Sequence, residues 1–205
     1  TWHKKKSSLI KEIATAFKNE KIVIRSSAIS EDSWKKSNAG SYKSFLNVDP
    51  NNFENVKNKI NEVFNSYNKL NSQNIKDEVL IQKYLQNTKS SGVLFTISNE
   101  NGSPYYIINY DDTSGITDTV TSGTSSDTKT IYVYKNFTSK KIKWLYDLLK
   151  VVKEIEKKVL HSKLDIEFAV DKKGNIFILQ VRPLVINKKL KFYSMLDFDD
   201  EIYSI

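Results

Sequence analysis

The sequence predicts a mixed α+β fold with a substantial hydrophobic core. Three observations lead to this prediction. Short apolar or alternating segments typical of strands lie between segments with helical periodicity. The chain has no internal repeat and no glycine-rich loop of the Rossmann or Walker A type. Its 205 residues, 39% hydrophobic and 27% charged, suffice for one globular unit or for two small lobes.

The first expected elements are a helix and a short strand. Residues 7–19 place their apolar and small side chains at helical spacing, which predicts an amphipathic helix. These side chains are Leu9, Ile10, Ile13, Ala14 and Phe17. Residues 21–25 follow as a short apolar run that ends in Arg25, which predicts a buried strand.

A second strand and a second helix are expected before residue 70. Residues 41–48 alternate between polar and apolar side chains, and Asp49-Pro50 stops this strand. Residues 52–69 carry apolar side chains at helical spacing, from Phe53 to Tyr67, and predict an amphipathic helix.

The middle of the chain is expected to contain three strands and a long loop. The strands are expected over residues 78–85, 91–97 and 105–110, the last one after a turn at residues 101–104. Residues 111–129 are rich in Thr, Ser, Gly and Asp, which is typical of a long functional or mobile loop.

The last part of the chain predicts a strand, a helix and a hairpin. Residues 130–134 predict the strand, and residues 138–161 predict a long amphipathic helix. Residues 163–183 predict two strands joined by a tight turn around Asp171–Gly174. Residues 188–205 turn acidic and are expected to form an exit linker or a docking segment.

Composition restricts the class of protein. The chain has no cysteine, hence no disulfide framework and no thiolate metal site, which fits a cytoplasmic protein. It has no apolar run long enough to cross a membrane and no signal peptide. Because it does not begin with Met, we expect it to be an excised fragment. The net charge of +8 favours anionic partners such as nucleotides.

Only two of the 32 basic residues are arginines, Arg25 and Arg182. The many lysines are expected to lie on the solvated surface. A nucleic-acid-binding domain would need more arginines and exposed aromatic side chains on one face, so we expect no nucleic-acid partner. A planar guanidinium binds phosphate in a bidentate manner that lysine cannot imitate. The two arginines are therefore candidate phosphate-binding residues.

The closing hairpin carries the strongest chemical signal. Asp165 and Glu167 point to one face of the first strand, and Gln180 and Arg182 share a face of the second. Carboxylate and amide oxygens beside an arginine suit the metal and the phosphates of a Mg²⁺-nucleotide. A two- or four-residue connection places Asp165 opposite Gln180, whereas a three-residue loop with a glycine bulge separates the polar groups. Both registers remain open, as does an ordinary amphipathic hairpin with solvated acids.

A second candidate phosphate site follows the strand that ends in Arg25. The segment Arg25-Ser26-Ser27 offers seryl hydroxyls, with Ser26 the nearest, and backbone N–H groups that suit phosphate oxygens. Gly40 would let the backbone close over phosphates. The alternatives are a helix cap with Arg25 in a structural salt bridge, and an ordinary turn at Gly40.

These residues together resemble the N-terminal nucleotide-binding domain of the pyruvate phosphate dikinase and phosphoenolpyruvate synthase family. Residues 23–28, followed by Glu31-Asp32 and by residues 39–48, resemble its phosphate-binding region. Residues 91–96 resemble its strand after the adenine hinge. Residues 165–167 and 178–183 resemble its metal-binding hairpin. The matches occur in family order and are specific jointly rather than singly.

The resemblance implies an ATP-grasp fold over residues 1–187, in which two lobes with mixed or antiparallel sheets clasp ATP. It implies that Arg25 contacts phosphates and that Gly40 belongs to the loop that covers them. The residues implied at the adenine-contacting hinge are Gln82, Tyr84 and Leu85. Glu167 and Gln180 would ligate Mg²⁺ and converge with help from a bulge, and Arg182 would lie near the transferring phosphoryl group. Arg25 and Arg182 are the implied catalytic residues, and ATP and Mg²⁺ the implied cofactors.

The chain also departs from the family pattern. The family's Gly-Leu-Gly-Glu-like segment is replaced by residues 112–123, where Asp118 takes the place of the glutamate. The family's Gly-Gly-Lys segment, its phosphohistidine domain and its acceptor-binding barrel are absent from the sequence. The resemblance implies that the latter two belong to the same full-length protein as partners of this domain.

The stretch from Asn109 to Gly123 and the Lys- and Asn-rich composition resemble a narrower subgroup, the L-glutamine kinases that phosphorylate the glutamine amide in capsule biosynthesis. Two alternatives remain open: a phosphoenolpyruvate synthase-like enzyme that acts on pyruvate, and a non-catalytic nucleotide-binding module.

Overall fold

The computed structural model describes residues 2–28, 32–33, 36–37, 42–69, 74, 76–115, 128–136 and 140–184. The chain divides into two compact units, with the boundary between Leu85 and Gln86. Each unit has its own hydrophobic core. The predicted α+β class is confirmed, since the described residues form helices and antiparallel sheets. Of the two arrangements that composition left open, the chain adopts two units.

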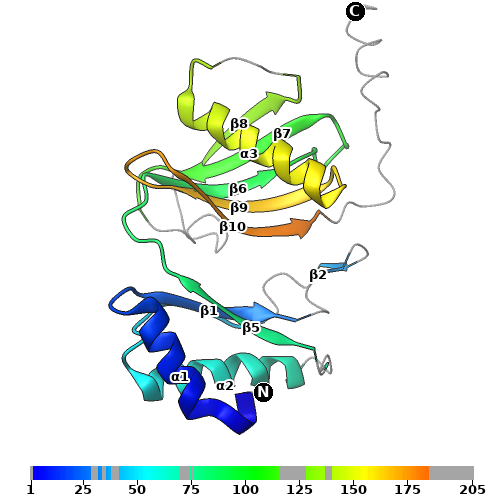
Figure 1. The fold of residues 1–205 in the computed structure, drawn as a ribbon. Coiled ribbons are helices and arrows are strands. Elements are labelled where there is room, and N and C mark those ends of the chain that lie inside the picture. Colours follow the sequence, from blue (N-terminus) through cyan, green and yellow to red (C-terminus); the bar gives the residue numbers. More distant parts are fainter. Residues whose placement is uncertain are drawn as a thin grey trace, which may run out of the picture. The chain divides into compact units, whose positions relative to one another are not determined.

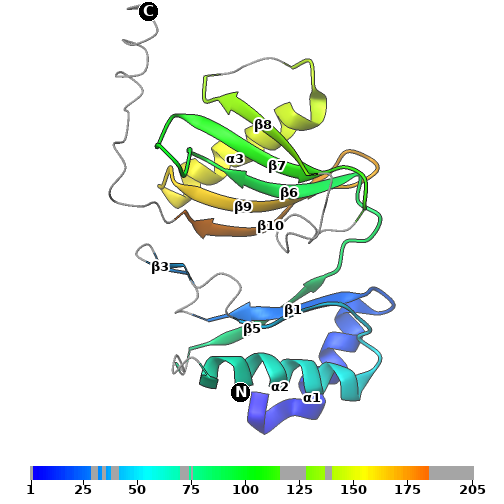
Figure 2. The same ribbon diagram turned by 180° about the vertical axis from the view of Figure 1, so that it is seen from behind.

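The first unit is a three-stranded antiparallel sheet with two helices on one face (Figures 1 and 2). Its elements are α1 (Trp2–Phe17), β1 (Ile22–Ser27), β2 (Asp32–Ser33), β3 (Lys36–Ser37), β4 (Ser44–Val48), α2 (Phe53–Lys69) and β5 (Glu78–Lys83). The strand order is β4-β1-β5, and β2 and β3 form a separate short pair.

Tyr67 connects α2 to strands β1 and β5 of this sheet. Its ring is 1% exposed, and its hydroxyl accepts a hydrogen bond from the backbone N of Ser27 at 3.1 Å. The same hydroxyl donates to the backbone O of Glu78 at 2.7 Å. Ile22 and Ile24 of β1 pack beneath α2, so the opposite face of β1 carries Arg25.

The second unit is a five-stranded antiparallel sheet with one helix. Its elements are β6 (Ser90–Phe95), β7 (Tyr105–Asp111), β8 (Lys129–Tyr134), α3 (Lys143–Val159), β9 (Leu164–Val170) and β10 (Ile176–Pro183). The strand order is β10-β9-β6-β7-β8. Helix α3 lies across one face of the sheet (Figure 1).

A buried polar network fixes α3 to this sheet. The hydroxyl of Tyr106 donates to Oε2 of Glu156 at 2.7 Å, and Nζ of Lys135 donates to Oε1 of Glu156 at 2.8 Å. Burial, followed by the hydrogen bond to Glu156, raises the pKa of Tyr106 far above its usual range. Tyr106 therefore remains a hydrogen-bond donor to Glu156.

The start of α1 differs from the prediction. The helix begins at Trp2 instead of near residue 7, with a kink at Lys5, where φ is −132°. Nε1 of Trp2 donates to Oδ1 of Asn61 at 2.9 Å, and the indole is buried. This tertiary contact holds a turn that lacks helical periodicity in the sequence.

Helix α3 is shorter than predicted at both ends. It begins at Lys143 instead of residue 138 and ends at Val159. Leu160 adopts a left-handed conformation with φ 54°, and its N–H donates to the backbone O of Glu156, which closes the helix. The remaining expected helix and strands are confirmed with boundaries that shift by three residues or fewer. Most of the expected 111–129 loop, including Asp118, lies outside the described residues, as do Gly40 and residues 188–205.

Strands β6 and β7 approach each other closely at Gly92. A Cβ atom at this position would overlap the backbone O of Asn109 and would lie 2.8 Å from Cα of Tyr110. Only glycine allows this spacing without a backbone shift. Within the described residues, no helix is both long and apolar enough to cross a membrane.

Candidate functional site

The face of the five-stranded sheet opposite α3 carries the polar residues of the predicted hairpin. Leu164, Ile166 and Phe168 of β9 belong to the core under α3. Because side chains alternate along a strand, Asp165 and Glu167 point to the opposite face, which we call the outer face.

A β-bulge brings Gln180 and Arg182 onto this outer face as well. The turn spans Asp171–Asn175, and pairing begins with Ile176 opposite Val170. Phe168 pairs with Ile178, but Glu167 pairs with Gln180, so Leu179 is the extra residue of the bulge. Arg182 then lies opposite Asp165.

The observed register therefore differs from that of a simple two- or four-residue connection, which would place Asp165 opposite Gln180. It agrees with the convergence of Glu167 and Gln180 that the family resemblance implies. The five-residue turn alone would set a register in which Gln180 faces the core, and the bulge restores it to the outer face.

Arg182 forms an ionic cluster with two carboxylates. Its Nη2 donates to Oε1 of Glu167 at 2.9 Å and lies 3.4 Å from Oδ2 of Asp165. The side chains of all three residues are between 12% and 19% exposed. Nε of Arg182 is buried and has no hydrogen-bond partner among the described residues. A buried donor without an acceptor fits a site that receives its acceptor oxygen from a ligand.

The chemistry of this cluster fits a magnesium nucleotide. It offers two carboxylates and one amide oxygen, and Mg²⁺ is usually held by one or two carboxylates together with substrate phosphates. No cluster of three or more His, Cys, Asp or Glu side chains suited to a metal exists within the described ranges. Mg²⁺ at Glu167 and Gln180 remains a prediction.

Two of the predicted residues of the first unit, Arg25 and Gln82, lie on one face of the small sheet. Arg25 pairs with Leu80, and Val23 pairs with Gln82, so Arg25 and Gln82 share the face of the small sheet that is turned away from its helices. Arg25 and Gln82 are half-buried. The pairing of β1 with β5 thus brings these two predicted residues onto one surface.

The other predicted residues are less well placed or untested. Ser26 is 6% exposed and lies on the same side of β1 as Ile22 and Ile24, so its hydroxyl is turned toward the helices. Tyr84 and Leu85 follow β5 and are half-buried, and the backbone N of Tyr84 donates to the O of Lys21 at 2.8 Å. Gly40 lies outside the described residues.

One buried acid at the end of β7 was not recognised from the sequence as part of the architecture. Asp111 is 2% exposed, and its Oδ1 accepts hydrogen bonds from the backbone N atoms of Thr113 and Ser114 at 2.7 and 3.0 Å. Burial opposes ionisation, but the hydrogen bonds from Ser114 and Thr113 outweigh it and hold the pKa of Asp111 well below its usual range. Asp111 therefore fixes the conformation of the residues that directly follow β7.

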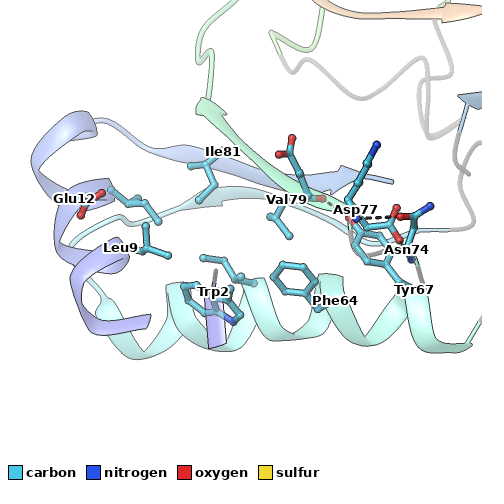
Figure 3. Close-up of a pocket in the computed structure, with 13 residues that line it drawn as sticks. Trp2, Leu9, Glu12, Phe64, Tyr67, Asn74, Asp77, Val79 and Ile81 are labelled. Carbon is cyan, nitrogen blue, oxygen red and sulfur yellow. Dashed lines mark hydrogen bonds between the residues drawn. The ribbon is translucent and has the colours of Figure 1, made fainter. Parts of the chain in front are cut away.

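A large pocket of about 1000 Å³ lies in the first unit (Figure 3). It is mainly apolar, with Trp2, Leu9 and Phe64 along one side and Val79 and Ile81 of β5 along another. None of the site residues that the sequence predicted lines it. Its apolar walls do not suit phosphate, so we do not assign the nucleotide to this pocket.

Comparison with known proteins gives a family. The model of the pyruvate phosphate dikinase AMP/ATP-binding domain matches residues 4–147. No curated protein matches the chain significantly. The matched residues end within α3, before β9 and β10, so the roles of Glu167, Gln180 and Arg182 depend on the geometry described above.

Proposed function

Because this chain belongs to the family of the pyruvate phosphate dikinase AMP/ATP-binding domain, we propose that it binds Mg-ATP and presents the terminal phosphoryl group for transfer. The observation that most strongly supports this proposal is the cluster of Asp165, Glu167, Gln180 and Arg182 on two paired strands. It combines metal-ligating oxygens with a phosphate-binding guanidinium on a rigid support.

Within this proposal, Glu167 and Gln180 would hold Mg²⁺, which supplies charge neutralisation and orients phosphate oxygens. Glu167 is the stronger ligand because its carboxylate is anionic. Arg182 binds the transferring phosphoryl group, and its contact with Asp165 keeps the guanidinium on the outer face. Because Arg182 forms an ion pair with Glu167, the arginine and a bound metal would share this carboxylate.

The first unit contributes the remaining proposed contacts. Arg25 is proposed to neutralise phosphate charge, and Gln82, Tyr84 and Leu85 to contact the adenine. Gly40 is proposed to lie in the loop that covers the phosphates. No phosphate contact is proposed for the hydroxyl of Ser26, because it is turned toward the helices. The common face of Arg25 and Gln82 supports the roles proposed for these two residues.

The phosphoryl group is proposed to pass to a carrier histidine on a further domain of the full-length protein and then to a small acceptor. The resemblance of residues 109–123 to glutamine kinases favours the L-glutamine amide as acceptor, with pyruvate as the alternative. Product analysis of the full-length protein with labelled ATP distinguishes them, because glutamine gives a phosphoramidate and pyruvate an enol phosphate.

A thermal-shift experiment tests nucleotide binding. A ligand that binds only the folded state at 100 times its Kd stabilises a protein by about 2.7 kcal/mol, so Mg-ATP at millimolar concentration should raise the Tm. ATP with excess chelator should raise it less. A folded chain whose Tm does not respond to Mg-ATP contradicts the proposal, and a rise with an oligonucleotide alone would indicate a nucleic-acid-binding module instead.

A further inference from the structure

A row of side chains crosses the entire outer face of the second unit through the ion cluster. Gln180 pairs with Glu167, Glu167 with Val93, Val93 with Asn109, and Asn109 with Thr130. Directly paired residues of antiparallel strands share a face, so all five side chains lie on the outer face. The row thus continues from the predicted metal ligands on β10 and β9 to a polar pair on β7 and β8.

The polar pair at the far end has a defined orientation. Oγ1 of Thr130 donates a hydrogen bond to Oδ1 of Asn109 at 2.8 Å. Since a hydroxyl donor must face the amide oxygen, the amide nitrogen of Asn109 forms the other end of the group. Within the described part of the chain, this nitrogen makes no hydrogen bond. Asn109 is partly exposed, and its side chain lies on the outer face.

An apolar residue separates Glu167 from Asn109 in this row. Strands β9 and β7 are separated by β6, so their backbones lie about 9–10 Å apart. The residue between them in the row is Val93, which is apolar and offers no competing charge. A phosphate held by a metal at Glu167 would have to lie over Val93 to reach Asn109.

We propose that the amide nitrogen of Asn109 donates a hydrogen bond to an oxygen of the metal-bound phosphates, and that Thr130 positions this amide. The inference rests on the proposed binding of Mg-ATP and adds two residues to that site. A neutral donor suits this place because Mg²⁺ and Arg182 would supply the positive charge for the phosphates at the other end of the row. The purely structural role of an Asn–Thr cross-strand pair would affect stability but not the choice of ligand.

The substitution Asn109→Asp tests the proposal with almost no change of shape. The carboxylate still accepts the hydrogen bond from Thr130, but it replaces the amide donor with an anionic oxygen that repels phosphate. We expect the Kd for Mg-ATP, measured by calorimetry on the full chain, to rise by tenfold or more. The Kd for AMP, which lacks the terminal phosphates, should rise much less. Thr130→Val, which keeps the branched shape, should weaken Mg-ATP binding severalfold.

Asn136→Asp is the matched control, because it makes the same charge change at an exposed position after β8. A Kd for Mg-ATP that is equal in Asn109→Asp and Asn136→Asp overturns the inference while leaving the proposed function intact. Equal losses for Mg-ATP and AMP also overturn it, since they indicate a structural role. If the unsubstituted chain does not bind Mg-ATP, the proposed function itself fails.

Discussion

Arg182 contacts two carboxylates through a single nitrogen, and this geometry explains why an arginine stands here in a chain in which all but two of the basic residues are lysines. A guanidinium has five donors in a fixed plane, so one edge can hold Glu167 and Asp165 while other donors face elsewhere. A lysine ammonium is a compact charge without this planar geometry. At this position, both the shape and the charge of the side chain are therefore expected to matter.

We expect Arg182→Lys to lower turnover of the full-length protein by tenfold or more, which corresponds to a barrier increase of at least about 1.4 kcal/mol. Phosphoryl transfer depends mainly on positioning and charge neutralisation, and lysine retains only the charge. The affinity for nucleotide should change less than turnover. Steady-state kinetics and calorimetry measure the two effects, and an unchanged kcat would show that Arg182 only anchors the end of β10.

Glu167→Gln should abolish phosphotransfer and increase the Mg²⁺ concentration needed for ATP to stabilise the chain. The amide preserves the size of the side chain and can still accept from Arg182, but it lacks the negative charge that binds a hard cation. A Mg²⁺ titration at fixed ATP, followed by Tm, provides the measurement. Glu154→Gln, at an exposed position of α3, is the control and should behave like the unsubstituted chain. Near-normal activity of Glu167→Gln would assign the carboxylate a structural role.

At the scale of single elements, the close approach of β6 and β7 at Gly92 leaves no room for a side chain. We expect Gly92→Ala to destabilise the chain by about 1–3 kcal/mol or more, because the added methyl group overlaps the backbone of Asn109. Urea unfolding measures this loss.

Gly174→Asn provides the contrast to Gly92→Ala. Gly174 has φ 89° and no atom within 4 Å of its would-be Cβ, and asparagine is among the residues that best tolerate positive φ. A loss of stability no larger in Gly92→Ala than in Gly174→Asn would mean that the two strands separate readily.

Most elements were predictable because their signal is local. The apolar spacing of residues 52–69 predicted α2 to within one residue, and the alternation of residues 164–170 predicted β9. The start of α1 was not predictable, since Trp2 is held by Asn61, which lies 59 residues away in the sequence. The ends of α3 depend on backbone conformation at Leu160, a residue type that rarely adopts positive φ.

The site was predictable in composition but not in geometry. The sequence indicated Glu167, Gln180 and Arg182 as candidates, yet it left the register of the hairpin open. The deciding feature is the bulge at Leu179, and the run from Ile176 to Val181 gives it no local signal. The row that joins Glu167 to Asn109 depends on pairing between strands that are distant in the sequence, which periodicity within one strand does not report.

At the scale of the whole molecule, the chain contains two hydrophobic cores. Ile24 belongs to the core of the first unit and Ile166 to the core of the second, and both side chains are fully buried. Each core is built from residues of its own unit. Stability is therefore expected to be distributed unevenly along the chain, as in proteins that open in separate cooperative segments.

A pair of matched substitutions tests this expectation. Ile24→Ala and Ile166→Ala each remove the same buried atoms and should each cost about 2–5 kcal/mol. Native-state hydrogen exchange should become faster mainly in residues 2–85 for the first variant and mainly in residues 86–184 for the second. If both variants accelerate exchange equally along the whole chain, the two cores unfold as one cooperative unit.

The extra residue at Leu179 has a consequence for how this strand changes over evolution. Loss of codon 179 would let Ile178 and Gln180 alternate regularly, with Ile178 still against α3 and Gln180 still opposite Glu167. Loss of codon 181 would instead turn Arg182 into the hydrophobic core. Codon 179 is therefore a position where β10 can lose a residue without exchanging its outer face for its packed face.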